Sequence, residues 1–79
     1  MRKRIDLFAD DKRSLFAKRL EFALEADGIT QSEFAERIGV SRSMINKYIC
    51  GLATPSFAVL MKIQKALDIS LDWLLGLVD

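Results

Sequence analysis

Residues 29–52 read ITQSEFAERIGVSRSMINKYICGL and contain two helix-start signals separated by one glycine. Residues 30–33, TQSE, match the capping box, in which a threonine side chain accepts the backbone N–H of the third helical residue and a glutamate bonds back to the cap. The sequence therefore predicts a helix over 31–38. Gly39 ends this helix, because glycine tolerates the positive φ found at helix ends. Ser41 is then the N-cap of a second helix.

The second helix has an apolar side and a polar side. At about 100° per residue, the apolar side holds Ile45, Tyr48, Ile49 and Leu52, and the polar side holds Arg42, Ser43, Asn46 and Lys47. These polar residue types hydrogen-bond the edges of DNA bases, since arginine and lysine bind guanine and asparagine binds adenine. Two helices joined by a tight glycine-containing turn have the layout of a helix-turn-helix, whose second helix enters a DNA major groove. The alternative is an ordinary amphipathic helix with a solvated polar face.

Basic residues are concentrated where a DNA contact would need them. From Arg37 to Leu67 the sequence has no Asp or Glu, but it has five bases, Arg37, Arg42, Lys47, Lys62 and Lys65. This imbalance suits a phosphate backbone, because cationic side chains release its counterions and anionic side chains repel it. The formal net charge of +1 does not by itself indicate nucleic acid. The uneven distribution of the charge does favour such a partner.

Residues 29–75 resemble the Cro/repressor (Xre-type) helix-turn-helix family of phage and bacterial transcription regulators. The resemblance is carried by ITQSEFAERIGVS at 29–41, by Ile45, by the loop from Gly51 to Pro55, and by ALDISLDWLLG at 66–76. It implies an all-α, lambda-repressor-like domain of five helices, in which helices two and three form the helix-turn-helix. It also implies a transcriptional regulator that binds double-stranded DNA sequence-specifically and acts as a repressor. A homodimer on a pseudo-palindromic operator is expected from the apolar residues at the end of the chain, which are described below. Activation through a surface that touches polymerase stays open.

The expected DNA contacts divide into base contacts and backbone contacts. The residues predicted to contact base edges are Arg42, Ser43, Asn46 and Lys47. Ser41 is better placed for a phosphate, and Lys47 has the alternative of holding the backbone. The resemblance implies a backbone contact for Gln31, at a helix N-terminus whose exposed N–H groups suit a phosphate. It implies further backbone contacts from the 51–55 loop, where Thr54 is the plausible donor in this sequence.

The resemblance also implies an ion pair between an Arg near the end of the first helix and a Glu near the end of the third. The matching positions here are Leu24 and Ile49. A packed apolar contact is therefore expected in place of the ion pair. Such a replacement is often neutral or stabilising.

The chain is expected to divide into a basic N-terminal arm, residues 1–10, and a helix-turn-helix domain, residues 11–79. The bases of the arm are Arg2, Lys3 and Arg4. They either belong to a solvated terminus or contact the DNA backbone or a groove, as basic arms do in several DNA-binding folds.

Two longer helices are expected around the helix-turn-helix. Asp10 or Asp11 caps the first of them, which runs to about Ala26. Ser56 caps the other, whose apolar residues recur at helical spacing. Its predicted buried stripe consists of Phe57, Leu60, Ile63 and Leu67.

The last residues of the chain are unusually apolar. Ser70 caps a short final helix, in which Trp73 is expected to join the core because a tryptophan buries a large area. The other apolar residues of interest here are Leu71, Leu75, Leu77 and Val78. They either complete the core or form a homodimer interface, and the interface is the preferred interpretation.

The composition argues against several other kinds of function. The chain has no His, a single Cys, no glycine-rich phosphate loop and no carboxylates clustered on one helix face. No metal site, no cofactor site and no catalytic acid–base pair is therefore expected. An enzyme is therefore the least supported interpretation. A lone Cys fits a reducing cytoplasm. No apolar run approaches the ~18 residues of a membrane span, and no signal peptide is recognised at the N-terminus.

Two further interpretations stay open. Antitoxins and restriction-system controllers share the fold that the resemblance implies, and they would differ from a repressor by a neighbouring gene. A protein-interaction module that has lost DNA binding would carry acids or bulky apolar residues on the polar side of the second helix. The chain ends where the DNA-binding unit of the family ends, so a complete small regulator and a fragment of a larger one are both compatible with it.

Overall fold

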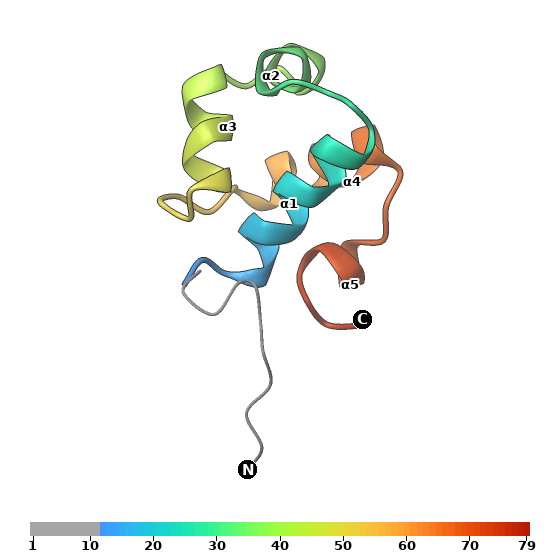
Figure 1. Cartoon of the computed structure of the whole chain (residues 1–79). Coiled ribbons are helices and arrows are strands. Elements are labelled where there is room, and N and C mark those ends of the chain that lie inside the picture. Colours follow the sequence, from blue (N-terminus) through green and yellow to red (C-terminus); the bar gives the residue numbers. More distant parts are fainter. Residues whose placement is uncertain (1–11) are drawn as a thin grey trace.

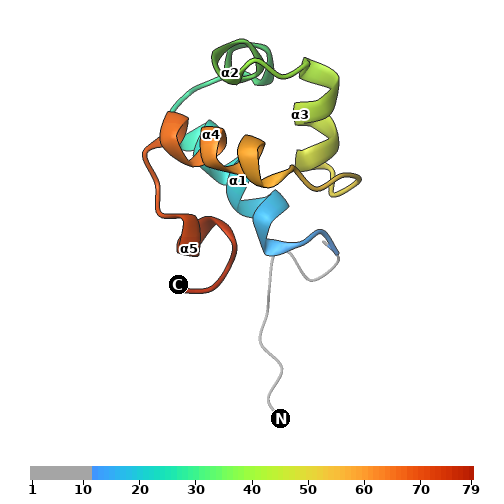
Figure 2. The same ribbon diagram turned by 180° about the vertical axis from the view of Figure 1, so that it is seen from behind.

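The computed structural model describes residues 12–79, and this part of the chain folds into five α-helices without strands. The helices are α1 (Leu15–Ala26), α2 (Gln31–Ile38), α3 (Arg42–Ile49), α4 (Phe57–Leu67) and α5 (Leu71–Leu74). α2 and α3 pack together at one end of the domain, and α5 lies at the other end (Figures 1 and 2). α1 contacts α3 and α5, and α4 contacts α2 and α5. The predicted five-helix fold is confirmed, with α2 and α3 as the helix-turn-helix.

One apolar core joins the five helices. Its larger buried residues are Leu20, Leu24, Phe34, Ile38, Ile45, Tyr48, Ile49, Ile63, Leu67 and Leu74. Removing this apolar surface from water is the main free-energy term that favours folding. Leu24 of α1 and Ile49 of α3 are only 3% and 5% exposed within the cluster. As predicted, apolar packing occupies the two positions where the resemblance implies an ion pair.

Side-chain caps begin the helices of the helix-turn-helix and the two that follow. The hydroxyl of Thr30 accepts the N–H of Glu33 at 3.1 Å, and the carboxylate of Glu33 accepts the N–H of Thr30 at 2.9 Å. Gly39 ends α2 in the left-handed conformation, with a φ of 72°. The hydroxyls that cap α3, α4 and α5 belong to Ser41, Ser56 and Ser70. The local signals identified in the sequence are therefore confirmed at each of these helix starts.

The start of α1 differs from the prediction. The N-cap is Ser14, whose hydroxyl accepts the N–H of Ala17 at 3.2 Å. The prediction of an aspartate cap for α1 is wrong, because the helix begins where its buried side starts, and Ala17 is the first fully buried residue. The predicted caps Asp10 and Asp11 lie outside the described residues. So do the bases of the arm, Arg2, Lys3 and Arg4.

Two residues predicted to be buried are instead exposed. Leu52 is 77% exposed, because α3 ends at Ile49 and the chain turns at Gly51, which has a φ of 78°. Phe57 is 73% exposed, because it is the first residue of α4 and precedes the buried part of that helix. Both errors come from extending a helical period to the edge of a loop.

Arg19 of α1 holds the C-terminal segment against the domain. Its guanidinium donates hydrogen bonds to the carbonyl of Trp73 and, at 2.7 Å, to the carbonyl of Val78. The guanidinium carbon also lies 5.0 Å from the centre of the Trp73 ring, a favourable cation–π arrangement. Trp73 is only half-buried, so its predicted place in the core is only partly correct. The fully buried residue of α5 is Leu74.

The capping box should make stability depend on acid pH. Hydrogen bonds from the backbone N–H and then the side chain of Thr30 hold the pKa of Glu33 below its ordinary value of 4.5. Because the folded-state pKa is lowered, the stabilisation is present above the ordinary pKa and is lost as the pH falls through the folded value. Glu33→Gln keeps an oxygen acceptor for the Thr30 N–H but cannot titrate.

We therefore expect the difference in unfolding free energy between wild type and Glu33→Gln to shrink as the pH is lowered from 7 through the acid range. Urea titrations at a series of pH values measure this difference. Glu36→Gln is the control, because Glu36 is an exposed glutamate of the same helix that takes no part in the capping box. A difference that stays constant with pH would contradict the assignment.

Candidate nucleic-acid interface

The polar side of α3 is exposed as a unit. The exposed residues at its start and along this side are Ser41, Arg42, Ser43, Asn46 and Lys47. On the other side, Ile45 and Ile49 are 0% and 5% exposed. Their burial sets the rotation of α3 about its axis. The four residues predicted to contact bases therefore share one solvent-facing surface.

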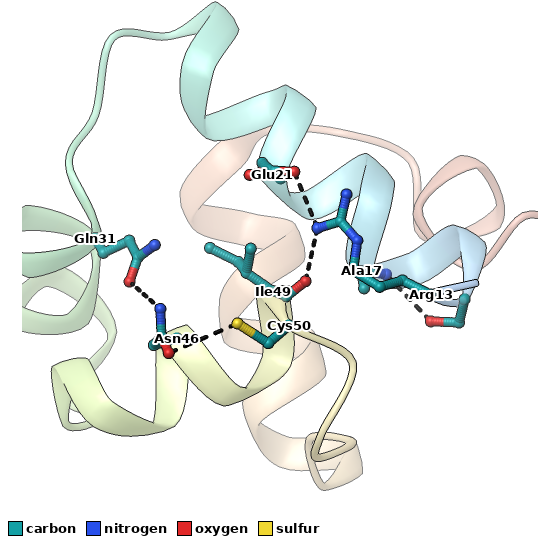
Figure 3. A network of polar contacts seen from close by, with 8 residues as sticks. Arg13, Ala17, Glu21, Gln31, Asn46, Ile49 and Cys50 are labelled. Atoms are coloured by element: carbon teal, nitrogen blue, oxygen red, sulfur yellow. Dashed lines mark hydrogen bonds and ion pairs between the residues drawn. The ribbon is translucent and has the colours of Figure 1, made fainter. Parts of the chain in front are cut away.

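The N-terminus of α2 lies beside this surface. Gln31, the first residue of α2, accepts a hydrogen bond at Oε1 from Nδ2 of Asn46 at 3.3 Å (Figure 3). The fold thus joins Gln31, which is predicted to contact the DNA backbone, to Asn46, which is predicted to contact a base edge. Ser41 caps α3 through its oxygen, and its hydroxyl hydrogen can still be donated to a phosphate.

Cys50 extends the same chain of contacts. Its thiol donates to Oδ1 of Asn46 at 3.7 Å, so both ends of the Asn46 amide are bonded (Figure 3). Thiol hydrogen bonds are weak, but this one favours a single orientation of the amide. Sequence reasoning missed the contact, although Asn46 and Cys50 have the four-residue spacing of neighbours on one helix face.

Arg13 contacts the last turn of α3 from the direction of α1. Its Nη1 donates to the carbonyl of Ile49 at 2.8 Å and lies 2.9 Å from Oε1 of Glu21 (Figure 3). The sequence did not point to Arg13, because it precedes α1 and lies 36 residues from Ile49. No signal of short range could have revealed this contact.

Thr54 is exposed in the loop that follows α3. It lines a hollow of about 560 Å³ whose wall also includes Lys12 and Arg13. The fold therefore brings two bases that precede α1 close to the loop. The sequence predicted Thr54 alone as a donor here, and the exposed Lys12 adds a cation beside it.

Acidic side chains of α1 border this surface. Glu21 and Glu25 of α1 line a groove together with Gln31. The ion pair with Arg13 offsets the charge of Glu21. α3, the following loop and α4 contain no Asp or Glu. The charged residues of these three segments are therefore all basic.

Residues 12–79 show neither a metal site nor a membrane span. No three His, Cys, Asp or Glu side chains in this range gather as metal ligands. None of the helices in it is long and apolar enough to cross a membrane. The polar side of α3 is the best-defined candidate site in the described part of the chain.

Comparisons with solved structures identify close structural neighbours. The restriction-modification controller protein C.AhdI from Aeromonas hydrophila superposes with a TM-score of 0.72 at 30% identity, over 76% of this chain and 91% of that one. The N-terminal DNA-binding domain of SinR from Bacillus subtilis gives a TM-score of 0.71 at 31% identity, over 77% of this chain and 90% of that one. At these levels the likeness extends to sequence as well as fold.

Sequence comparisons agree with this likeness. The cryptic phage CTXphi transcriptional repressor RstR of Vibrio cholerae is 39% identical over 59 residues, which cover 75% of this chain and 53% of RstR. The chain spans 53% and 26% of the lengths of the first two curated relatives that it matches. The helix-turn-helix family pattern matches residues 20–74, which include all of α2, α3, α4 and α5. The chain therefore belongs to the helix-turn-helix family of DNA-binding transcriptional regulators that includes the Cro-type and Xre-type repressors.

Proposed function

We propose that the protein binds double-stranded DNA sequence-specifically through α3 and represses transcription by occupying an operator near a promoter. The observation that carries this proposal is the exposed, acid-free side of α3, where Arg42, Asn46 and Lys47 share one surface. Such cations and amides match the edges of guanine and adenine in the major groove. The proposal assigns no catalytic activity. A bacterial or phage regulator of this kind works in the cytoplasm, which holds the DNA.

Backbone contacts are proposed for residues that surround α3. Gln31 lies at the start of α2, Ser41 at the start of α3, and Thr54 in the loop after it. Contacts to phosphates at these points would fix the register of α3 on the duplex without reading bases. The arm bases Arg2, Lys3 and Arg4 are proposed to add electrostatic affinity.

Selection of bound duplexes from a random DNA pool tests the function directly. We expect an enriched two-fold motif with half-sites about 10 bp apart, and an affinity that falls by several log units per log unit of salt. Failure to enrich any motif, with binding lost at about 0.15 M salt, would leave only non-specific charge attraction. The proposal would then give way to a protein-interaction module.

Arg42→Ala and Gln31→Ala should weaken binding in different ways. Loss of a base contact should relax preference at one position of the selected site by about 1–3 kcal/mol. Loss of a backbone contact should weaken all sites about equally. Affinities of both variants for the selected site and for its single-base variants measure the distinction. A uniform loss for Arg42→Ala would reassign Arg42 to a phosphate.

A second copy of the chain is proposed to bind an apolar surface that we call the α1/α5 face. It consists of Leu15, Phe22, Leu75, Leu77 and Val78, which are between 39% and 70% exposed. Gly76 packs closely on Leu15, and the Phe22 ring lies 6.3 Å from the Trp73 ring, so the two helices share one surface. Leu71, which the sequence suggested for this interface, is partly buried against the core.

The position of the α1/α5 face suits a dimer that binds DNA. α5 lies away from α3 (Figures 1 and 2), so a partner docked beside α5 leaves α3 free. Exposed apolar patches of this kind mark interaction sites. A self-complementary interface gives two-fold symmetry, which matches a pseudo-palindromic operator.

Leu77→Ser tests the dimer. Leu77 is 70% exposed, so its replacement should leave the fold intact while weakening self-association. Phe57→Ser is the matched control, because Phe57 is 73% exposed on α4. We expect sedimentation equilibrium to show a lower average mass for Leu77→Ser and no change for Phe57→Ser. A wild-type monomer at concentrations that saturate the operator, or dissociation by Phe57→Ser alone, would contradict the α1/α5 interface.

The role of a restriction-modification controller is a second candidate. It is favoured by the structural likeness to C.AhdI, which extends over 91% of that controller chain. Both roles use the same DNA-binding surface, so the selection experiment supports either. The position of the selected motif distinguishes them, since a controller site would lie before restriction-modification genes.

A further inference from the structure

The last turn of α3 is tied to α1 through one arginine. Arg13 donates from Nη1 to the carbonyl of Ile49 at 2.8 Å and forms an ion pair with Glu21 at 2.9 Å (Figure 3). The side chain of Arg13 is 24% exposed and that of Glu21 is 41% exposed. The aliphatic stem of Arg13 also lies against Gly51 in the loop. A Cβ added to Gly51 would be only 3.3 Å from Cγ of Arg13.

The bond to Ile49 completes the C-terminus of α3. The last four carbonyls of a helix have no partner within the helix. The carbonyls of Asn46, Lys47 and Tyr48 accept N–H groups from the residues that follow α3. The carbonyl of Ile49 accepts from Arg13. A cation at this position also interacts favourably with the negative end of the helix dipole.

Glu21 orients the guanidinium of Arg13 toward the end of α3. Both acceptors are contacted by Nη1. The planar guanidinium fixes the directions of its N–H bonds, whereas the ammonium group of a lysine rotates freely. Glu21 belongs to α1, so the pair Arg13–Glu21 links the end of α3 to a second helix. Leu24 and Ile49 are buried in the same apolar cluster, and apolar packing has little directional preference. Arg13 therefore adds a directional contact at the last turn of α3 to the apolar packing of the core.

We propose that Arg13 is a positioning residue for DNA reading. With Glu21 it holds the last turn of α3 and the loop from Gly51 to Pro55, and thereby the placement of Asn46 and Thr54 on the duplex. This inference rests on the proposed function. A direct bond from Arg13 to a DNA phosphate is the competing role, and the two roles predict different responses to salt and to loss of Glu21.

The test uses Arg13→Met, which keeps the stem that packs on Gly51, and Glu21→Gln, which removes the charge of the acceptor. If Arg13 positions α3, each variant should weaken binding to the selected operator by roughly three- to tenfold, the size expected of a partly exposed charged contact. The double variant should bind no more weakly than Arg13→Met, because both changes break one linkage. Arg13→Lys should fall between wild type and Arg13→Met.

Two further readouts separate positioning from a general loss of stability. The salt slope should be the same in wild type and Arg13→Met, and the preference for the best base at the positions read by Asn46 should decrease. Matched controls are Lys12→Met and Glu25→Gln, which remove a neighbouring base and a nearby acid outside this linkage. Lys12→Met should lower affinity without changing base preference, and Glu25→Gln should not weaken binding.

The proposal is overturned if Arg13→Met lowers the salt slope by about one unit while Glu21→Gln binds as well as wild type, since Arg13 would then hold a phosphate. It is also overturned if both variants lower only the melting temperature. Hydrogen exchange in the free protein tests the linkage without DNA. The amides of Cys50, Gly51 and Leu52 should exchange faster in Arg13→Met than in Lys12→Met, even if no operator motif is found and the proposed function fails.

Discussion

The packing of α2 against α3 is the constraint on which the rest of the domain depends. Phe34 and Ile45 are both fully buried in the same cluster, and the short turn at Gly39 brings them together. The N–H of Val40 donates to the carbonyl of Ala35 at 3.0 Å, which closes the turn. With so short a connection, burial of both apolar sides leaves α3 one rotation about its axis. That rotation turns the polar side of α3 outward.

Polar contacts then refine the placement that burial sets. Asn46 is bonded to Gln31 of α2, and Ile49 is bonded to Arg13 beside α1. These contacts lie near solvent, where each hydrogen bond or ion pair contributes little on its own. They differ from the core contacts in being directional. The core therefore decides which side of α3 faces outward, and the polar contacts decide how its exposed side chains and its last turn are held.

The errors of sequence reasoning lie at the ends of helices. Leu52 and Phe57 continue an apolar period, yet they flank the loop after α3 and are exposed. A periodic pattern does not show where a helix stops. The end is marked by a local signal, which here is Gly51. The start of α1 shows the same limit, because Ser14 and two aspartates are equally acceptable caps by residue type. Packing against the core selects Ser14.

The sequence by itself determined α2, its glycine turn, the start of α3 and the polar side that α3 exposes. These features depend on bonds between residues three or four apart, such as the pair Thr30 and Glu33, and on helical spacing. The tertiary structure alone decided that Arg13 meets Ile49, 36 residues away, and that Arg19 holds the carbonyl of Val78, 59 residues away. Such contacts depend on which faces of different helices are buried together. That choice is made by the packing of the whole core, and no short stretch of the chain records it.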